Sequence, residues 1–355
     1  MQSYIQPELT LQKGEAAFNV LKKEVKSIDL EGSISQTAHF RTLMCTVILV
    51  PLVVFSWTST FSFWVALNYF LIAILIAQFA FLGHEGGHGA ISNSPTQNKF
   101  IGQYCMTIFA GLAFDEWRER HNVHHKNCQY ELKDPDMDVA VVVSLTEVSL
   151  KQKRGIGVVF SRIQHFSIWW LSLFFGLSQR HLSQFAAIKQ FKRYTMDCIF
   201  LILHFSVWIV FPVAVLGFPL SNVLNTYFIP VVIVGPYLAG VFWVNHIGMP
   251  LIDNEESFSF LEHQVRTSRN IKNPIFLDWL FGGLNYQIEH HLFPRIPANK
   301  IKRIQPIVKE QISRLGWNYN EYGWWETIYY IGRHLRQIGA QLKPKLTPSL
   351  SMREF

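Results

Sequence analysis

The sequence predicts an all-α integral membrane protein with four transmembrane helices in two hairpins and a cytoplasmic helical cap that carries the histidine motifs. Three observations predict this fold. Charged residues make up only 16% of the 355-residue chain, against roughly 25% in a soluble domain. No Lys or Arg lies between Arg41 and Lys99, or between Arg193 and Arg266. Histidines gather beside these apolar stretches. We therefore expect residues 1–355 to form a single domain threaded through a bilayer.

The first hairpin is predicted over residues 40–82. Apolar runs at 43–57 and 61–82 are separated by the polar triplet at 58–60. A membrane helix needs about 20 apolar residues, and the first run reaches that length when it is counted from Phe40. One buried core helix would be much shorter than this pair of runs.

The second hairpin is predicted over residues 196–244. Its helices, 196–218 and 223–244, flank a turn at 219–222. Neither hairpin turn contains a basic residue, so the positive-inside rule places both turns on the outer side. Segments 83–195 and 245–355 are then cytoplasmic. The charged first forty residues are unlike a signal peptide, so both termini are also expected in the cytoplasm.

Two shorter hydrophobic segments lie between the hairpins. Residues 100–113 are apolar but too short to span. Residues 158–177 are rich in aromatic residues and interrupted by Arg162, and Trp169 and Trp170 favour a helix along the membrane surface. A fifth crossing there is the alternative, but it would place the histidine motifs on opposite sides. Beyond residue 298 a polar helical segment follows, with tryptophans suited to the interface.

The net charge of +7 and the four cysteines exclude other classes of protein. The basic residues lie outside the apolar stretches, which indicates contact with anionic lipid and no nucleic-acid partner. The cysteines are scattered and show no CxxC spacing, so no disulfide framework is expected.

Eight of the fourteen histidines fall in four places along the sequence. Within three of these motifs, residues three or four apart share one helix face, and Gln287 stands three residues before a histidine pair. Eight imidazoles exceed the needs of one metal ion and suit two. Imidazole binds Fe, Zn, Cu and Ni alike, so the ligands do not name the metal. The predicted ligands are His84, His88, His121, His124, His125, His246, His290 and His291. The remaining histidines lack such partners and are expected to be structural.

Two other functions fit parts of this pattern. His84-Glu85-x-x-His88 matches the motif of a zinc metalloprotease, in which the Glu is the general base. That function leaves the later histidine motifs unexplained, and Glu85 is expected to have no catalytic role. A bis-histidine haem protein would place single histidines in mid-membrane, whereas these motifs lie at helix ends.

Together the motifs resemble the membrane fatty acid desaturase family, over most of the chain. The three histidine boxes of that family correspond to 84–88, 121–125 and 287–291. A Gln that opens the third box is similar to the branch containing the front-end desaturases. So are the phrases DPDMD at 134–138, NHIGMP at 245–250, QVRTSRN at 264–270 and GGLNYQIEHHLFPRIP at 282–297.

The resemblance implies a non-haem centre of two Fe ions held by the eight histidines, with O2 as co-substrate. Gln287 is then a possible ligand or a neighbour of the ligands, and Asn245 such a neighbour. Stearoyl-type relatives have an Asn where this chain has Phe242. The diiron centre itself is the catalytic group, and no separate acid or base is assigned. Arg118, Arg120, Lys126 and Arg266 are candidates for contact with a headgroup or an electron donor, or are membrane anchors.

The implied reaction joins an acyl chain, O2, two electrons and two protons to give a cis double bond and two waters. The acyl chain would arrive linked to lipid, coenzyme A or carrier protein. A related hydroxylase or acetylenase would present similar boxes. The chain has no His-Pro-Gly-Gly haem motif, so the expected electron donor is a separate ferredoxin, cytochrome b5 or reductase.

Overall fold

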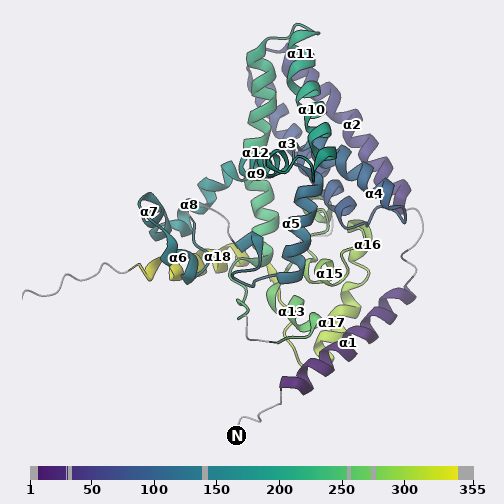
Figure 1. Ribbon diagram of the computed structural model, residues 1–355, viewed down its shortest axis with the longest axis vertical. Coiled ribbons are helices and arrows are strands. Elements are labelled where there is room, and N and C mark those ends of the chain that lie inside the picture. The colour runs from purple at the N-terminus through teal and green to yellow at the C-terminus, as the bar shows by residue number, and fades with distance from the viewer. Residues whose placement is uncertain are drawn as a thin grey trace, which may run out of the picture.

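Four long apolar helices form the upright bundle at the top of the computed structural model (Figure 1). The structure describes residues 7–28, 30, 34–137, 143–253, 257–272 and 277–342. Within these residues, four helices are long and apolar enough to cross a membrane, as predicted. They span Gln36–Thr58, Phe63–Gly87, Thr195–Ala214 and Leu220–His246.

Each of the four spans has a local sequence reason for its course. Helix α2 (Ile34–Thr58) ends at the polar triplet, and Ser62 accepts a hydrogen bond from the Val65 amide to begin α3 (Phe63–Gly87). The third span comprises α10 (Thr195–Phe205), the π-helical turn η4 (Ser206–Val210) and α11 (Phe211–Ala214). Helix α12 (Leu220–His246) packs against α2, α3 and α9. Outward side chains of α2, such as Phe40 and Leu43, are large, apolar and exposed, which suits a lipid environment.

The apolar segment after α3 folds back into the bundle without crossing it. It forms α4 (Pro95–Gly102) and the π-helix η1 (Gln103–Phe109), which packs between α3 and α10. A helix that ends inside a membrane bundle needs hydrogen-bond donors for its last carbonyl groups. His204 and Trp208 each bond the Ile108 oxygen at 2.8 Å, and Arg180 donates to the Ala110 oxygen at 3.0 Å. This bonding fits the structural role expected of His204.

The segment between the second histidine motif and α10 is a chain of short helices. After α5 (Phe114–Asn127) and the single turn η2 (Pro135–Met137) come α6 (Glu147–Gln152), α7 (Ile156–Arg162), α8 (Gln164–Leu171), η3 (Ser172–Phe174) and α9 (Phe175–Lys189). The surface helix expected over 158–177 is thus divided, with its first break at Ile163. Phe166 and Trp170 are largely exposed on α8.

The C-terminal region forms a second body below the bundle (Figure 1). Helix α1 (Pro7–Ser27) packs on α13 (Phe260–Thr267) and α17 (Gln305–Arg314). The other helices are α14 (Asp278–Phe281), α15 (Gln287–Leu292), α16 (Ala298–Ile301) and α18 (Trp324–Ala340). The fold is not strictly all-α, because β1 (Asn270–Lys272) pairs in parallel with β2 (Glu321–Gly323). This small sheet ties the α13–α15 segment to the base of α18.

Candidate metal centre

The histidines meet where the membrane bundle joins the C-terminal region. The last turn of α3 supplies His84, and His88 caps that helix. Helix α5 supplies three histidines, the last residue of α12 is His246, and α15 supplies the final pair. The prediction that helix α3 ends at residue 82 was short by five residues, and His84 belongs to the helix.

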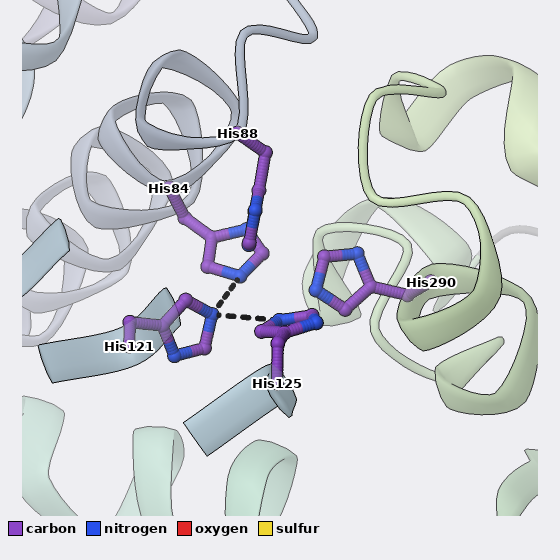
Figure 2. A group of neighbouring side chains, drawn as sticks. All are labelled: His84, His88, His121, His125 and His290. Atoms are coloured by element: carbon purple, nitrogen blue, oxygen red, sulfur yellow. Dashed lines mark hydrogen bonds between the residues drawn. The ribbon is translucent and has the colours of Figure 1, made fainter. Parts of the chain in front are cut away.

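The first group is a five-histidine cluster made of His84, His88, His121, His125 and His290, whose ring nitrogens lie within 4.8 Å of one another. Figure 2 shows the five rings pointing toward a common space. Nε2 of His121 lies 3.0 Å from Nε2 of His84 and 3.1 Å from Nε2 of His125. Nitrogens bound about 2.1 Å from one metal ion lie roughly 3.0–3.4 Å apart. The spacing therefore matches ligands around a single ion.

The second group is a three-histidine cluster made of His124, His246 and His291, with Cys128 beside it. The three ring centroids are 4.9–5.2 Å apart. His291 stacks on His125 of the other cluster at 4.2 Å between centroids. The two clusters are therefore adjacent, as two neighbouring metal ions require.

Two of the histidine boxes divide their rings between the two clusters. In α5, His121 and His125 belong to the five-histidine cluster, whereas His124 belongs to the three-histidine cluster. In α15, His290 and His291 are divided in the same way. Each of these helices therefore contributes to both clusters.

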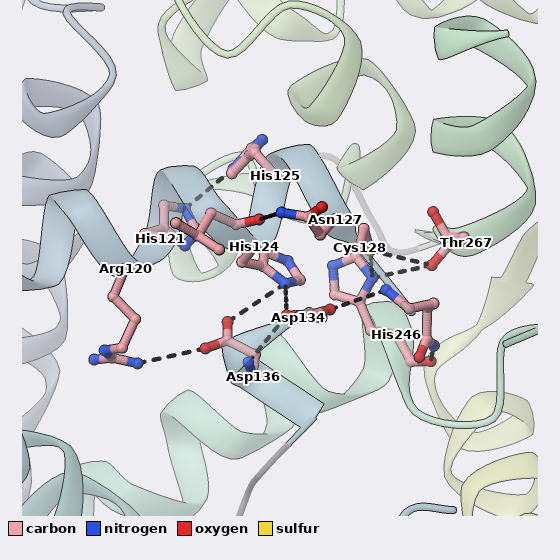
Figure 3. A network of polar contacts seen from close by, with 12 residues as sticks. Arg120, His121, His124, His125, Asn127, Cys128, Asp134, Asp136, His246 and Thr267 are labelled. Carbon is pink, nitrogen blue, oxygen red and sulfur yellow. Dashed lines mark hydrogen bonds and ion pairs between the residues drawn. The ribbon is translucent and has the colours of Figure 1, made fainter. Parts of the chain in front are cut away.

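Every ring of the three-histidine cluster is held through Nδ1, as Figure 3 shows for His124 and His246. His124 Nδ1 lies 2.9 Å from an Asp134 carboxylate oxygen, and His246 Nδ1 lies 3.0 Å from the Thr267 carbonyl. His291 Nδ1 lies 2.7 Å from Gln264 Oε1. Because carboxylate and carbonyl oxygens only accept, each Nδ1 carries the proton and each Nε2 keeps its lone pair. This is the usual arrangement of metal-ligating histidines.

Cys128 is a poor candidate for a ligand. Its sulfur lies 3.3 Å from Nδ1 of His246, the protonated nitrogen that faces Thr267. Burial raises the pKa of the Cys128 thiol well above its ordinary value, so the thiolate that binds metals is disfavoured. We assign Cys128 to packing behind His246.

Glu85 points into an ion pair, as expected for a residue without a catalytic role. Its carboxylate lies 2.7 Å from a guanidinium nitrogen of Arg41 on α2. His84 and His88, its partners in the zinc-protease motif, converge with three further histidines instead of one additional ligand. The geometry therefore disfavours the metalloprotease alternative.

Burial favours the neutral form of five of the imidazoles. It lowers the pKa of His88 to about 3 and the pKa values of His121, His125 and His290 well below the ordinary value. The pKa of His291 is lowered in the same way. The pKa of His124 is instead raised, because the carboxylates beside it outweigh its burial. Only a neutral imidazole has a lone pair to give to a metal, so burial prepares the five rings with lowered pKa values to bind an ion.

A buried carboxylate anchors α15. Glu289 accepts hydrogen bonds from Asn270 Nδ2 and Tyr319 Oη, each at 2.7 Å, and Asn270 Oδ1 accepts from the Ile288 amide at 2.9 Å. Burial raises the pKa of Glu289 to about 7, although the two hydrogen bonds lower it in part. The network fixes the short helix that supplies one histidine to each cluster.

The donor set fits two metal ions. Buried Nε2 atoms of His88, His290 and His291 have no hydrogen-bond partner within the described chain. Leaving a buried polar atom unpaired costs about 1–3 kcal/mol, so several such atoms converging at one place call for a ligand. Two metal ions, one in each of the adjacent clusters, would satisfy these eight imidazoles. The match to a known family decides what kind of protein carries them: the profile of the family described as fatty acid desaturase matches residues 38–323.

The chain belongs to the fatty acid desaturase family. Among its relatives, the mouse (Mus musculus) fatty acid desaturase 2-like protein FADS2B is 30% identical over 252 residues, covering 70% of this chain and 51% of the relative. The Arabidopsis thaliana Delta(8)-fatty-acid desaturase 2 is 26% identical over 322 residues, covering 87% and 72%. The Delta 8-(E)-sphingolipid desaturase of Komagataella phaffii is 27% identical over 307 residues, covering 79% and 55%. The chain thus spans about half the length of two of these three relatives.

Sequence reasoning missed the groups that orient these histidines. Asp134 and Gln264 open two phrases that were noted only as similar to the family, DPDMD and QVRTSRN. Thr267 acts through its carbonyl, which no side-chain pattern reveals. For Asp134 and Gln264 the sequence did offer a signal, because each is a polar residue at the start of a family-like motif to which no other role was assigned.

The four basic candidates lie near the clusters but are mostly engaged. Arg118 pairs with Asp115, and Arg120 with Glu116 and Asp136. Arg266 pairs with Glu262 at 3.5 Å, and Lys126 is exposed on α5. These internal ion pairs favour an anchoring role over contact with a headgroup.

Proposed function

We propose that this chain is a membrane-bound fatty acyl desaturase that uses two non-haem irons and O2 to introduce a cis double bond. Its family membership supports the reaction class. The observation that carries the proposal is the convergence of eight imidazoles in two adjacent clusters, in which three buried Nε2 atoms have no hydrogen-bond partner within the described chain.

In this proposal each cluster holds one iron. The five-histidine cluster supplies five nitrogen ligands to the first iron. The three-histidine cluster supplies Nε2 of His124, His246 and His291 to the second iron and leaves positions open. When bound, the iron pair would supply the activation of dioxygen that removing hydrogen from an unactivated methylene requires.

The protein's own residues position and isolate this centre. Asp134, Gln264 and the Thr267 carbonyl hold three rings in the tautomer that ligation needs. Gln264 also donates to the His125 carbonyl at 3.0 Å, so it couples α13 to both clusters. Glu289 and Asn270 hold α15 beneath them. Most of these groups are fully buried, which excludes bulk water from the centre.

A small cavity beside the five-histidine cluster is the proposed place where the acyl chain reaches the metals. Its walls are His84, Glu85 and His290 together with Gly282, Gly283, Leu284, Pro294, Ile296, Ala298 and Ile301. The apolar part of these walls suits methylene groups, and the cavity would have to widen to admit an acyl chain. The reaction consumes the acyl chain, O2, two electrons and two protons and yields the double bond and two waters.

The names of the relatives inform the substrate class. Two of them are named for fatty-acid and sphingolipid substrates. We propose an acyl lipid or acyl thioester substrate with the double bond set from its carboxyl side. A hydroxylase or acetylenase would form a different product, and the lipid profiling described below distinguishes these reactions from desaturation.

The proposed topology has two hairpins, with the termini and the centre on the cytoplasmic side. The uncharged turns at 58–60 and 215–219 and the basic segments around the centre support it through the positive-inside rule. Electrons would come from a donor such as ferredoxin, cytochrome b5 or a reductase.

Metal analysis paired with lipid profiling tests the function. Purified wild-type chain is expected to hold about two irons, and cells expressing it to gain an unsaturated acyl species. The His124→Ala and His290→Ala variants, one for each cluster, are expected to hold less iron than the wild type and to lose the new species. A hydroxylated product would select the alternative reaction. A single zinc that survives both substitutions, with unchanged lipids, would contradict the proposal.

A further inference from the structure

Gln287 and Asn245 form a buried pair that meets the three-histidine cluster at His246. Their exposed fractions are 3% and 0%. Asn245 Nδ2 donates to Gln287 Oε1 at 2.9 Å, and Gln287 Nε2 lies 2.9 Å from His246 Nε2. The pair therefore connects the end of α12 to the first residue of α15.

Two backbone carbonyls determine which way both amides point. Asn245 Nδ2 also lies 2.9 Å from the Val241 oxygen and 3.0 Å from the Leu284 oxygen, so its two N–H groups serve three surrounding acceptors. Turning the Asn245 amide over would set its oxygen against two carbonyl oxygens. With Asn245 fixed, turning Gln287 over would set two NH2 groups against each other. The hydrogen-bond network thus assigns the Gln287 oxygen to Asn245 and its nitrogen to His246.

This orientation removes Gln287 from the ligands. An amide binds hard metal ions through its oxygen, and the oxygen here is held by Asn245. The amide nitrogen is a donor only. Its acceptor in the metal-free protein is the Nε2 lone pair of His246, which is the same lone pair that a metal would take.

We propose that Gln287 donates a hydrogen bond to the small exogenous ligand that shares a metal ion with His246, and that Asn245 positions Gln287 to do so. The inference rests on the proposed function, because it requires a metal in the three-histidine cluster. Once His246 Nε2 binds that metal, the Gln287 N–H needs another acceptor. A water or anion in an open position of the same ion is the acceptor within reach. Three histidine ligands leave such positions, whereas the five-histidine cluster is nearly filled.

Azide binding to the cobalt(II)-loaded chain tests the inference without turnover. The purified full chain is loaded with Co²⁺, its cobalt content is measured, and azide is titrated while the visible absorption is followed. Gln287→Ala is expected to retain two cobalt ions but to bind azide about tenfold or more weakly, since hydrogen bonds to charged groups are among the strong ones. Asn245→Ala is expected to weaken azide binding less, because Gln287 remains but can turn.

Two further variants make the result decisive. Gln287→Met keeps the length of the side chain and replaces Gln287→Ala if that variant does not fold, with the same expected result. Gln97→Ala removes an exposed Gln on α4 and is expected to leave azide affinity unchanged.

Three results would overturn the inference. A Gln287→Ala chain that keeps only one cobalt would make Gln287 a ligand, and the proposed function would stand. A Gln287→Ala chain that binds two cobalt ions and azide with unchanged affinity would show that Gln287 does not contact the exogenous ligand. The proposed function would again stand. A wild-type chain that binds fewer than two cobalt ions would remove the basis of both.

Discussion

The two histidine clusters lie side by side but are held in different ways. Each ring of the three-histidine cluster bonds an oxygen of a neighbouring element through Nδ1. Within the described chain, the rings of the five-histidine cluster contact other imidazoles and Trp117, which stacks on His121 at 4.6 Å between centroids. The three-histidine cluster has fewer ligands, and each is oriented by a hydrogen bond. The five-histidine cluster has more ligands, which are oriented mainly by packing against one another. Either kind of interaction can therefore orient the ligands of a metal site.

Deleting one ligand from each cluster tests most directly whether the number of ligands distinguishes the two clusters. We expect His246→Ala to lower the iron content from about two ions per chain to about one, because two remaining histidines do not complete a site. His88→Ala leaves four histidines in its cluster and is expected to retain more iron. Metal analysis of the two purified variants checks this, and equal losses would show that ligand number is not what distinguishes the clusters.

Removing an orienting oxygen tests the hydrogen bonds of the smaller cluster. We expect Asp134→Ala to weaken the binding of one metal about 10–100-fold, the usual cost of losing a partner of a ligating histidine. Competition with a chelator measures this loss. The comparison variant Trp117→Phe keeps a stacking ring against His121 and should leave both affinities nearly unchanged. If Asp134→Ala weakened both metals equally, the clusters would not be independent.

The anchor of α15 should act on both clusters at once. We expect Asn270→Ala to destabilise the metal-free protein by about 1–3 kcal/mol, since Glu289 loses a buried donor and the Ile288 amide its acceptor. Because His290 and His291 move together, chelator competition should show both metals weakened by similar factors. Thermal unfolding in detergent gives the stability change. A loss confined to one metal would mean that α15 does not couple the clusters.

The smallest expected effect concerns the start of α5. Asp197 is fully buried and accepts from the amides of Asp115 and Glu116 at 3.0 and 3.1 Å. It therefore caps the helix that carries three of the ligands. We expect Asp197→Asn to lower stability by about 1 kcal/mol while both metals are retained. A variant that unfolds at the wild-type temperature would show that the cap does not stabilise α5.

Much of this architecture was predictable because it depends on composition and local spacing. The four spans follow from apolar length, and the eight histidines from box spacing. The groups that orient the rings were not predictable, since Gln264 reaches His291 across 27 residues and Thr267 contributes only its backbone. The division of His124 from His125 also escaped prediction, because residues on one helix face can still point to different ions. The break between α7 and α8 at Ile163 was not predicted, although Arg162 was seen to interrupt the apolar stretch there.

The paired histidines of α5 and α15 have a further consequence for the distance between the metals. His124 and His125 serve different clusters, and so do His290 and His291. Consecutive Cα atoms are separated by about 3.8 Å across a trans peptide, and the ring centroids lie 5.8 Å apart in both pairs. Two separate helices would therefore each restrain the distance between the metals, and a movement of one helix relative to the other would strain its ligands to both.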